Sequence, residues 1–136
     1  MRKTASVILG AGTTALLLGS LLTAPLSLAQ GTAPSNAVCN DKANPPTDPA
    51  VQGGCVVIDP RKGNCHTCHV IPGVSSGNVA PPLVSIAQRF PDKAKLRAQV
   101  WDPRVANPKT VMPPFGAYGI LSEDEIDKVV AFLLTL

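Results

Sequence analysis

The C-terminal end of the chain carries the clearest alternation of apolar and polar positions. In "SEDEIDKVVAFLLTL" the apolar residues recur at helical spacing, namely Ile126, Val129, Val130 and Leu133. Such a stripe predicts a helix with one face packed on a core. Ser122 and Glu125 stand at the spacing of a capping box, in which each side chain accepts the backbone N–H of the other residue. We therefore expect a regular last helix that serves packing rather than chemistry.

Two helices are expected nearer the middle of the chain. In "TDPAVQGGCVVID" Asp48 is placed to cap a helix that starts at Pro49 and ends before Pro60. Proline suits the first position of a helix but not its interior. In "LVSIAQRF", residues 83–90, apolar side chains again follow a helical period, and Pro91 closes the segment.

A further helix is expected in "DKAKLRAQVWD", where Leu96 and Val100 lie on one face. Residues 30–47 are rich in Pro and Asn without any periodicity, and they predict an irregular N-terminal arm. The chain has no internal repeat. The pattern as a whole predicts an all-α domain of short helices over residues 48–136, preceded by the arm.

The first 29 residues have the pattern of a secretory signal peptide. Arg2 and Lys3 give a basic end, a long uncharged stretch follows, and Ser27 and Ala29 suit a cleavage site. We expect residues 1–29 to be removed after Ala29 and the mature protein to reside in the periplasm, with no membrane attachment. An uncleaved membrane anchor is the alternative, because the uncharged stretch is nearly long enough to span a bilayer. No cysteine follows the cut, which argues against a lipoprotein.

The composition indicates that the domain needs a bound group. Loss of Arg2 and Lys3 lowers the formal net charge from +3 to +1, which favours neither nucleic acid nor a membrane surface as partner. The chain has 14 Pro and 11 Gly but only three Phe, one Trp and one Tyr. A small domain with so many turn-forming residues has difficulty in building a core from side chains alone. A bound group would supply the missing apolar volume.

The stretch "GNCHTCHVIPG" offers the chemistry that such a group requires. Cys65 and Cys68 flank two residues, and His69 follows at once. A zinc site would need further ligands, and Cys39 and Cys55 lack the spacing of a second zinc knuckle. A thioredoxin-like dithiol belongs beside a βαβ pattern, which this sequence does not show. C-x-x-C-H is instead the attachment signal for haem c, in which both thiols bond to the haem and the histidine binds its iron.

Other residues suit a haem attached at this motif. A ligand histidine donates its second N–H to a nearby acceptor, and the carbonyl of Pro81 in "APPL" is a candidate for His69. The mature chain has one methionine, Met112, in the proline-rich loop "NPKTVMPPFGAYG", where a rigid backbone can hold the thioether over the iron. Core packing is the alternative role for Met112, and loop stiffening the alternative role for the prolines. His66 is too close to the attachment point to reach the opposite face of the haem, and we expect it to be an exposed spacer.

Short helices around C-x-x-C-H and a methionine loop resemble the class I cytochromes c. The segments "LRAQVWD", "NPKTVMPPFG" and "ILSEDEIDKVVAFLLTL" make the chain similar, over residues 48–136, to the sulfur-oxidation cytochrome family SoxX. The resemblance implies a class I cytochrome c fold around one covalent haem c. It also implies the roles of four residues, with attachment at Cys65 and Cys68 and iron ligation by His69 and Met112.

The resemblance further implies partners and a role. In that family the monohaem subunit forms a heterodimer with a SoxA cytochrome, and the complex acts as an L-cysteine S-thiosulfotransferase that couples thiosulfate to a cysteine of the SoxYZ carrier. The SoxX-like subunit would contribute no catalytic residue and would pass electrons to a small cytochrome c. Two alternatives stay open: a free-standing periplasmic carrier that serves an oxidase or another dehydrogenase, and a haem enzyme or gas sensor, which needs the sixth iron position free.

Two cysteines lie outside the haem motif. Cys39 and Cys55 both follow the signal peptide, so both would meet an oxidising compartment. We expect them to form a disulfide between the arm and the first helix. Their separation of 16 residues closes a short loop, for which chain entropy predicts about 3 kcal/mol of stabilisation. Two free buried thiols, or one exposed thiol for redox work, are the alternatives.

Overall fold

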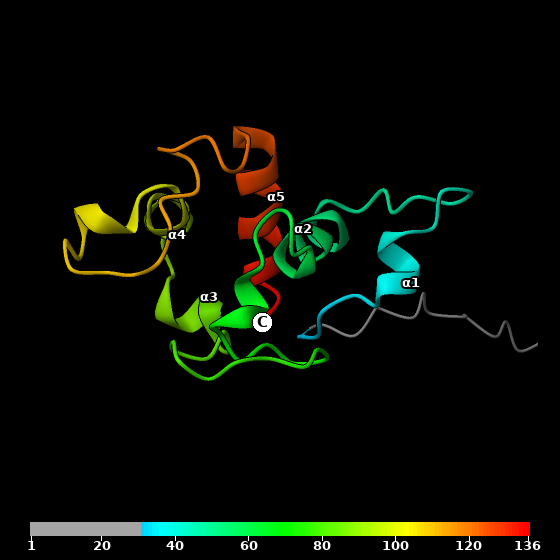
Figure 1. Cartoon of the computed structure of the whole chain (residues 1–136), viewed down its shortest axis with the longest axis horizontal. Coiled ribbons are helices and arrows are strands. Elements are labelled where there is room, and N and C mark those ends of the chain that lie inside the picture. The colour runs from blue at the N-terminus through cyan, green and yellow to red at the C-terminus, as the bar shows by residue number, and fades with distance from the viewer. Residues whose placement is uncertain (1–30) are drawn as a thin grey trace, which may run out of the picture.

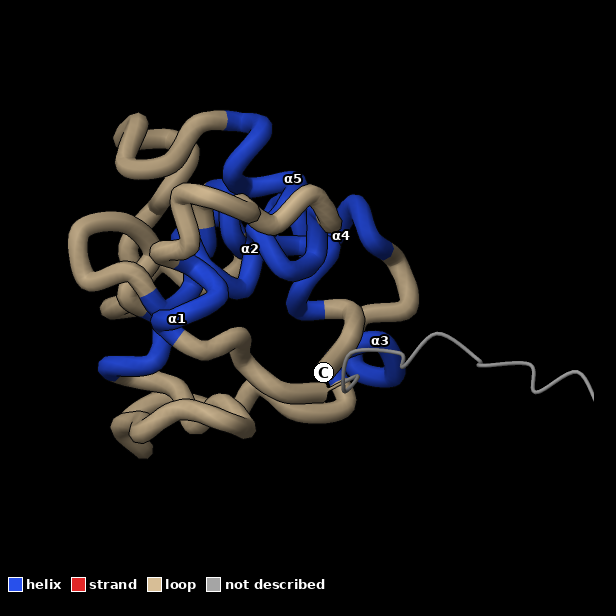
Figure 2. Tube along the Cα trace, turned by 90° about the vertical axis from the view of Figure 1, so that its right-hand side faces the viewer, coloured by secondary structure: helices blue, strands red, loops and turns tan. Residues whose placement is uncertain are grey.

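The computed structural model describes residues 31–136, so the expected signal peptide lies outside the described residues. The described chain is helical (Figure 1), with α1 (Asn36–Cys39), α2 (Pro49–Ile58), η1 (Cys65–Thr67), α3 (Ile86–Arg89), α4 (Lys93–Trp101), η2 (Pro103–Val105) and α5 (Glu123–Leu133). Helices and loops make up this part of the chain without strands (Figure 2). Within residues 31–136 we find no helix that is both long and apolar enough to cross a membrane. The predicted all-α class agrees with this architecture.

Helices α2 and α5 pack against each other at the centre of the core, and they lie side by side in both views (Figures 1 and 2). The apolar stripe of α5 is buried as predicted, with exposed fractions between 0 and 6% for Ile126, Val129, Val130 and Leu133. Gly53 of α2 lies against the backbone of α5 at Lys128, where an added Cβ atom would overlap the carbonyl group. The glycine that weakens α2 locally therefore permits the close contact between the two helices.

The predicted starts of α2 and α5 are confirmed, and α4 begins in the same way. The Asp48 carboxylate accepts two backbone N–H groups at the start of α2, and Asp92 does the same for α4. Ser122 and Glu125 form the capping box of α5. These side chains satisfy N–H groups that the helix itself leaves without partners, which explains why the boundaries could be read from the sequence.

The helix expected at residues 83–90 is shorter than predicted. It begins only at Ile86, because Ser85 adopts a left-handed backbone conformation with φ 52°. The N–H of Ser85 donates to the carbonyl of Leu136, the last residue of the chain. A tertiary contact thus overrides the apolar period at the start of this segment.

The N-terminal arm is fastened to the domain by hydrogen bonds and a disulfide. Ala33 is buried and donates its N–H to the carbonyl of Pro72 at 2.7 Å. Further on, the stretch expected to be irregular contains one turn of helix, α1, which Ser35 caps and which ends at Cys39. Cys39 is joined by a disulfide to Cys55 of α2, with the Cα atoms 5.4 Å apart. The arm therefore contacts both α2 and the loop that follows η1.

Candidate functional site

Cys65 begins η1, a single turn of 3-10 helix, and Cys68 follows directly after it as the C-cap. Asn64 adopts a left-handed conformation with φ 48° and accepts a hydrogen bond from the Thr67 hydroxyl at 2.7 Å, which turns the chain into η1. The N–H groups of Cys68 and His69 then donate to the carbonyl of Cys65, at 3.2 and 2.9 Å. This winding gathers two thiols and an imidazole on one short segment, as covalent haem attachment requires.

The environment of the Cys65 thiol does not suit a redox-active dithiol. Cys65 packs against the core and Cys68 is exposed. Burial raises the pKa of the Cys65 thiol to about 12. A reactive dithiol needs the opposite, a lowered pKa that gives thiolate at neutral pH. Among residues 31–136, no three or more His, Cys, Asp or Glu side chains are grouped as metal ligands.

The ring of His69 is oriented by a backbone carbonyl. Its Nδ1 atom lies 2.6 Å from the carbonyl oxygen of Pro81. Because a carbonyl can only accept, Nδ1 is the donor in this contact, and in the neutral ring Nε2 keeps its lone pair. The Pro81 segment is itself held to the motif by a hydrogen bond from the N–H of Ala80 to the carbonyl of Cys68, at 3.0 Å. An oriented imidazole with a free Nε2 is the form that binds iron.

Met112 belongs to the methionine loop, which we define as residues 106–121, between η2 and α5. Its side chain is half-buried and contacts the core. Its backbone N–H donates to the hydroxyl of Thr110 at 3.1 Å. Pro113 and Pro114 follow directly, and Pro114 is buried. Two prolines restrict the backbone beside the thioether, so the loop holds Met112 with few alternative conformations.

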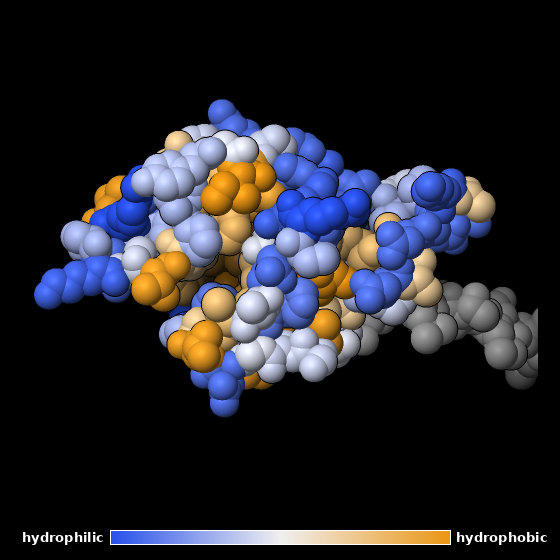
Figure 3. Space-filling view, in the orientation of Figure 1, coloured by the Kyte–Doolittle hydropathy of each residue, from blue (hydrophilic) through white to orange (hydrophobic). Residues whose placement is uncertain are grey.

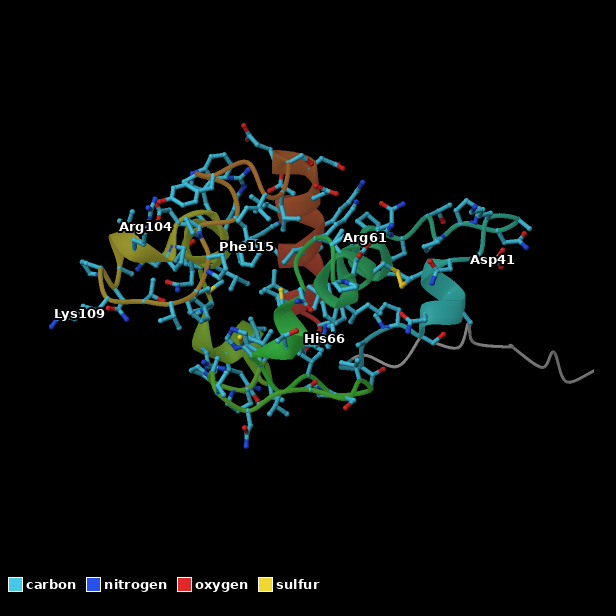
Figure 4. The ribbon with its side chains drawn as sticks, viewed as in Figure 1. Asp41, Arg61, His66, Arg104, Lys109 and Phe115 are labelled. Atoms are coloured by element: carbon cyan, nitrogen blue, oxygen red, sulfur yellow. A yellow bond between two sulfur atoms is a disulfide. The ribbon has the colours of Figure 1, made fainter. Side chains whose placement is uncertain are left out.

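A hollow separates η1 from the methionine loop. Figure 3 shows it as a dark recess with apolar side chains in and around it, and Figure 4 shows Phe115 on the loop side and His66 on the η1 side. Phe115, on the loop side, is itself buried at 6% exposed. The donor groups and the apolar surroundings both fit a haem. The residues that would hold it are Cys65 and Cys68 by covalent bonds and His69 and Met112 at the iron.

His66 does not have the environment that the sequence predicts. It is half-buried rather than exposed, and its Nδ1 atom is enclosed with no hydrogen-bond partner among residues 31–136. The loop after the motif folds back over it, and Gly77 donates its N–H to the His66 carbonyl at 2.8 Å. A Cβ atom on Gly77 would run into the carbonyl of Thr67, so only glycine allows this close return.

Sequence reasoning also missed the contact that fastens the methionine loop to α4. The carbonyl of Trp101, the last residue of α4, accepts N–H groups from Gly116 and Ala117 at 3.1 and 3.2 Å. The apolar face of Leu96 and Val100 predicts the helix but says nothing about this contact. No local pattern links a tryptophan to a glycine 15 positions further on, because the pairing depends on the path of the loop.

A comparison with protein families bears on this site. The family model described as cytochrome c oxidase, cbb3-type, subunit III matches residues 61–133, more than half of the chain. The chain belongs to this family of c-type cytochromes. It therefore binds one covalently attached haem c, and the helical architecture fits a small cytochrome. The matched region includes the C-x-x-C-H motif, the methionine loop and α5.

The cytochrome also resembles a curated protein, an uncharacterized lipoprotein of Aquifex aeolicus (strain VF5). The two are 31% identical over 75 residues. The aligned stretch makes up 54% of this chain and 36% of the relative, so the cytochrome spans about a third of that protein's length. Because the relative is described as uncharacterized, the role of the cytochrome has to be inferred from its own residues.

Proposed function

We propose that this cytochrome is the monohaem electron-transfer subunit of a periplasmic, SoxAX-type thiosulfate-oxidising complex. The observation that carries the electron-transfer role is the presence of two residues that can serve as axial ligands, an oriented His69 directly after the motif cysteines and a half-buried Met112 in the methionine loop. With both in place, the iron has no open position for a substrate. The haem, when bound, supplies one-electron chemistry.

The residues around the haem suit an electron acceptor. Methionine as an axial ligand raises the reduction potential relative to a harder ligand. Pro81 keeps the His69 ring in one orientation, which limits the rearrangement that accompanies a change of oxidation state. The described residues show no cysteine free for sulfur chemistry beyond the motif, because Cys39 and Cys55 are bridged. Sulfur chemistry would therefore take place on the larger partner subunit, and this chain would pass electrons to a small cytochrome c.

The assignment to thiosulfate oxidation rests on the resemblance of three segments to the SoxX family. Those segments correspond to the end of α4, the methionine loop and α5, which are the parts that surround Met112 or support the core. The secretory pattern at the N-terminus and the description of the relative as a lipoprotein both support an exported protein. Export is what a periplasmic complex requires.

A free-standing electron carrier is the second candidate. The matching family is described as a subunit of a cytochrome c oxidase, which favours a carrier that serves an oxidase. Purification of the tagged holoprotein from thiosulfate-grown cells separates the two roles. We expect a second, SoxA-like cytochrome to co-purify in equal amount. A stable haem-loaded monomer without such a partner would contradict the Sox assignment and support the carrier.

Exposed valines beside the haem residues offer a sharper test of docking. Val111 precedes Met112 and is 98% exposed, and Val79 precedes Ala80 and is 80% exposed. Apolar side chains next to both halves of the site suit a partner that must bring its own redox centre close. We expect V79D and V111D to reduce co-purification of the partner while the haem spectrum is unchanged.

The matched control for these variants is V38D. Val38 is also exposed, at 43%, but it lies on α1 at the opposite end of the molecule (Figure 1). We expect V38D to leave co-purification of the partner unchanged. Equal loss in all three variants would show that the charge acts non-specifically.

A further inference from the structure

We propose that Trp101 is the positioning residue for Met112, and that its carbonyl and its indole ring hold the methionine loop at the distance that the sixth ligand needs. The inference rests on the proposed ligation of iron by Met112. Trp101 itself would touch neither the iron nor the reacting atoms. It would act through the backbone that follows the methionine.

The first support is a double hydrogen bond at the end of α4. The Trp101 carbonyl accepts from both Gly116 and Ala117, at 3.1 and 3.2 Å. This carbonyl is one of those that a helix leaves without intrahelical partners, so it is available to bind a loop. The methionine loop is thereby anchored only four residues after Met112.

The second support is the close approach of the loop backbone to the indole ring. A Cβ atom on Gly116 would overlap three ring carbons of Trp101, so the loop passes directly against the ring and only glycine fits there. Between this contact and Met112 stand Pro113, Pro114 and the buried Phe115. Because the two prolines restrict the backbone in between, fixing Gly116 also limits where the Met112 thioether can lie.

The third support is that the ring is itself fixed to the core. Trp101 is half-buried and packs against the core, and the guanidinium carbon of Arg97 lies 5.3 Å from the ring centroid. Arg97 donates to Asp127 at 2.7 Å and to Glu123 at 3.1 Å, both on α5. A cation over an indole face is attractive. The ring therefore connects the loop to the central helix of the molecule.

A second contact of the loop is less suited to this role. Arg104 donates to the carboxylate of Asp102 and to the hydroxyl of Tyr118, and its guanidinium lies 4.6 Å from the Tyr118 ring centroid. Tyr118, however, is 66% exposed, so solvent weakens the contact. We therefore assign the positioning of Met112 to Trp101 rather than to Tyr118.

Competition by imidazole measures the proposed effect. A thioether binds ferric iron weakly, and a preorganised loop lowers the entropy that its binding costs. If the loop is loosened, an external ligand displaces Met112 more readily. The experiment titrates the oxidised holoprotein with imidazole and records the haem spectrum, and it records thermal unfolding by circular dichroism in parallel.

The variants are W101L, W101F and G116A, with V111A as the matched control in the same loop. We expect the apparent dissociation constant for imidazole to fall by at least about tenfold in W101L and G116A, and to stay within about twofold in V111A. W101F keeps an aromatic ring and should give an intermediate value. If W101L does not accumulate as holoprotein, W101F and G116A carry the test.

Unchanged imidazole affinity in G116A and in the folded Trp101 variants would overturn the proposal, even if their unfolding temperatures fall, because a merely structural role moves only the latter. M112A serves as the reference for a missing sixth ligand. If M112A binds imidazole no more tightly than the unmodified protein, Met112 is not a ligand, and the proposed ligation fails together with this inference. If M112A binds more tightly while the Trp101 variants do not, only the inference fails.

Discussion

At the scale of the single residue, Gly53 determines how closely α2 and α5 approach. Alanine in a helix is ordinarily more stable than glycine by roughly 0.5–1 kcal/mol. At Gly53, however, the methyl group would meet the backbone of Lys128 and Val129, which cannot move without displacing α5. The two effects have opposite signs, and the steric one is expected to prevail.

We predict that G53A lowers the free energy of unfolding of the holoprotein by about 1–3 kcal/mol, as overpacked cores do. Urea unfolding followed by circular dichroism measures this free energy. G54A is the matched control, because its methyl group would meet side-chain atoms of Pro34 and Phe132 rather than helix backbone. G54A should therefore lower the free energy of unfolding by less than G53A. A stability gain in G53A would show that the helices can move apart freely.

The candidate site was readable from the sequence where it depends on local geometry. Cys65, Cys68 and His69 are neighbours in the sequence, so the single turn of η1 and the two residues after it are enough to group them. The contact between His69 and Pro81 was also expected, because a ligand histidine needs an acceptor nearby. The half-buried position of His66 was not readable, because it depends on a loop that returns at Gly77.

At the scale of the element, helix starts were readable and long-range contacts were not. The caps of α2, α4 and α5 use side chains within three residues of each helix start. The start of α3, by contrast, depends on the hydrogen bond from the N–H of Ser85 to the carbonyl of Leu136, which is far away in the sequence. The pairing of Trp101 with Gly116 depends in the same way on how the methionine loop crosses α4.

Helix α5 is also joined to the loop after α2 by an ion pair. Lys62 donates to Glu125, and this hydrogen bond, together with the backbone N–H of Ser122, lowers the pKa of the Glu125 carboxyl below its ordinary value of 4.5. The folded state therefore binds fewer protons in this range than the unfolded state. The stabilisation is present above about pH 4.5 and is lost as the pH falls through the lowered pKa.

We predict that E125Q, which can keep the capping box, is less stable than the unmodified protein at neutral pH by under about 1 kcal/mol, since the Lys62 side chain is 47% exposed and solvent screens the pair. The difference should shrink as the pH is lowered below the ordinary pKa of glutamate. Urea unfolding over a pH series measures it, and K62Q should show the same trend. A difference that does not change with pH would rule out a contribution from this carboxylate charge.

At the scale of the whole molecule, the protein consists of the N-terminal arm and a domain. All of the predicted haem residues lie in the domain. The fastenings of the arm include the disulfide between Cys39 and Cys55 and the hydrogen bond from Ala33 to Pro72. None of the predicted haem residues belongs to the arm. Loss of the bridge should therefore affect stability and not the iron.

We predict that the double variant C39S/C55S loses about 3 kcal/mol of unfolding free energy, the chain-entropy value for a loop of this length. Its haem spectrum should match that of the unmodified protein. Mass spectrometry after alkylation without reduction first verifies the bridge in the mature protein. Two alkylated cysteines at positions 39 and 55, or an altered haem spectrum in the double variant, would contradict this account of the arm.

The central claim is that Met112 and His69 complete the coordination of a haem bound through Cys65 and Cys68. The most direct test compares the oxidised absorption spectrum and the reduction potential of the unmodified protein with those of M112A, with V111A as control. We predict that M112A loses the thioether-to-iron band and has a lower potential, because a harder ligand favours ferric iron, while the haem stays covalently attached. An M112A protein with an unchanged oxidised spectrum and potential would show that Met112 is not the sixth ligand.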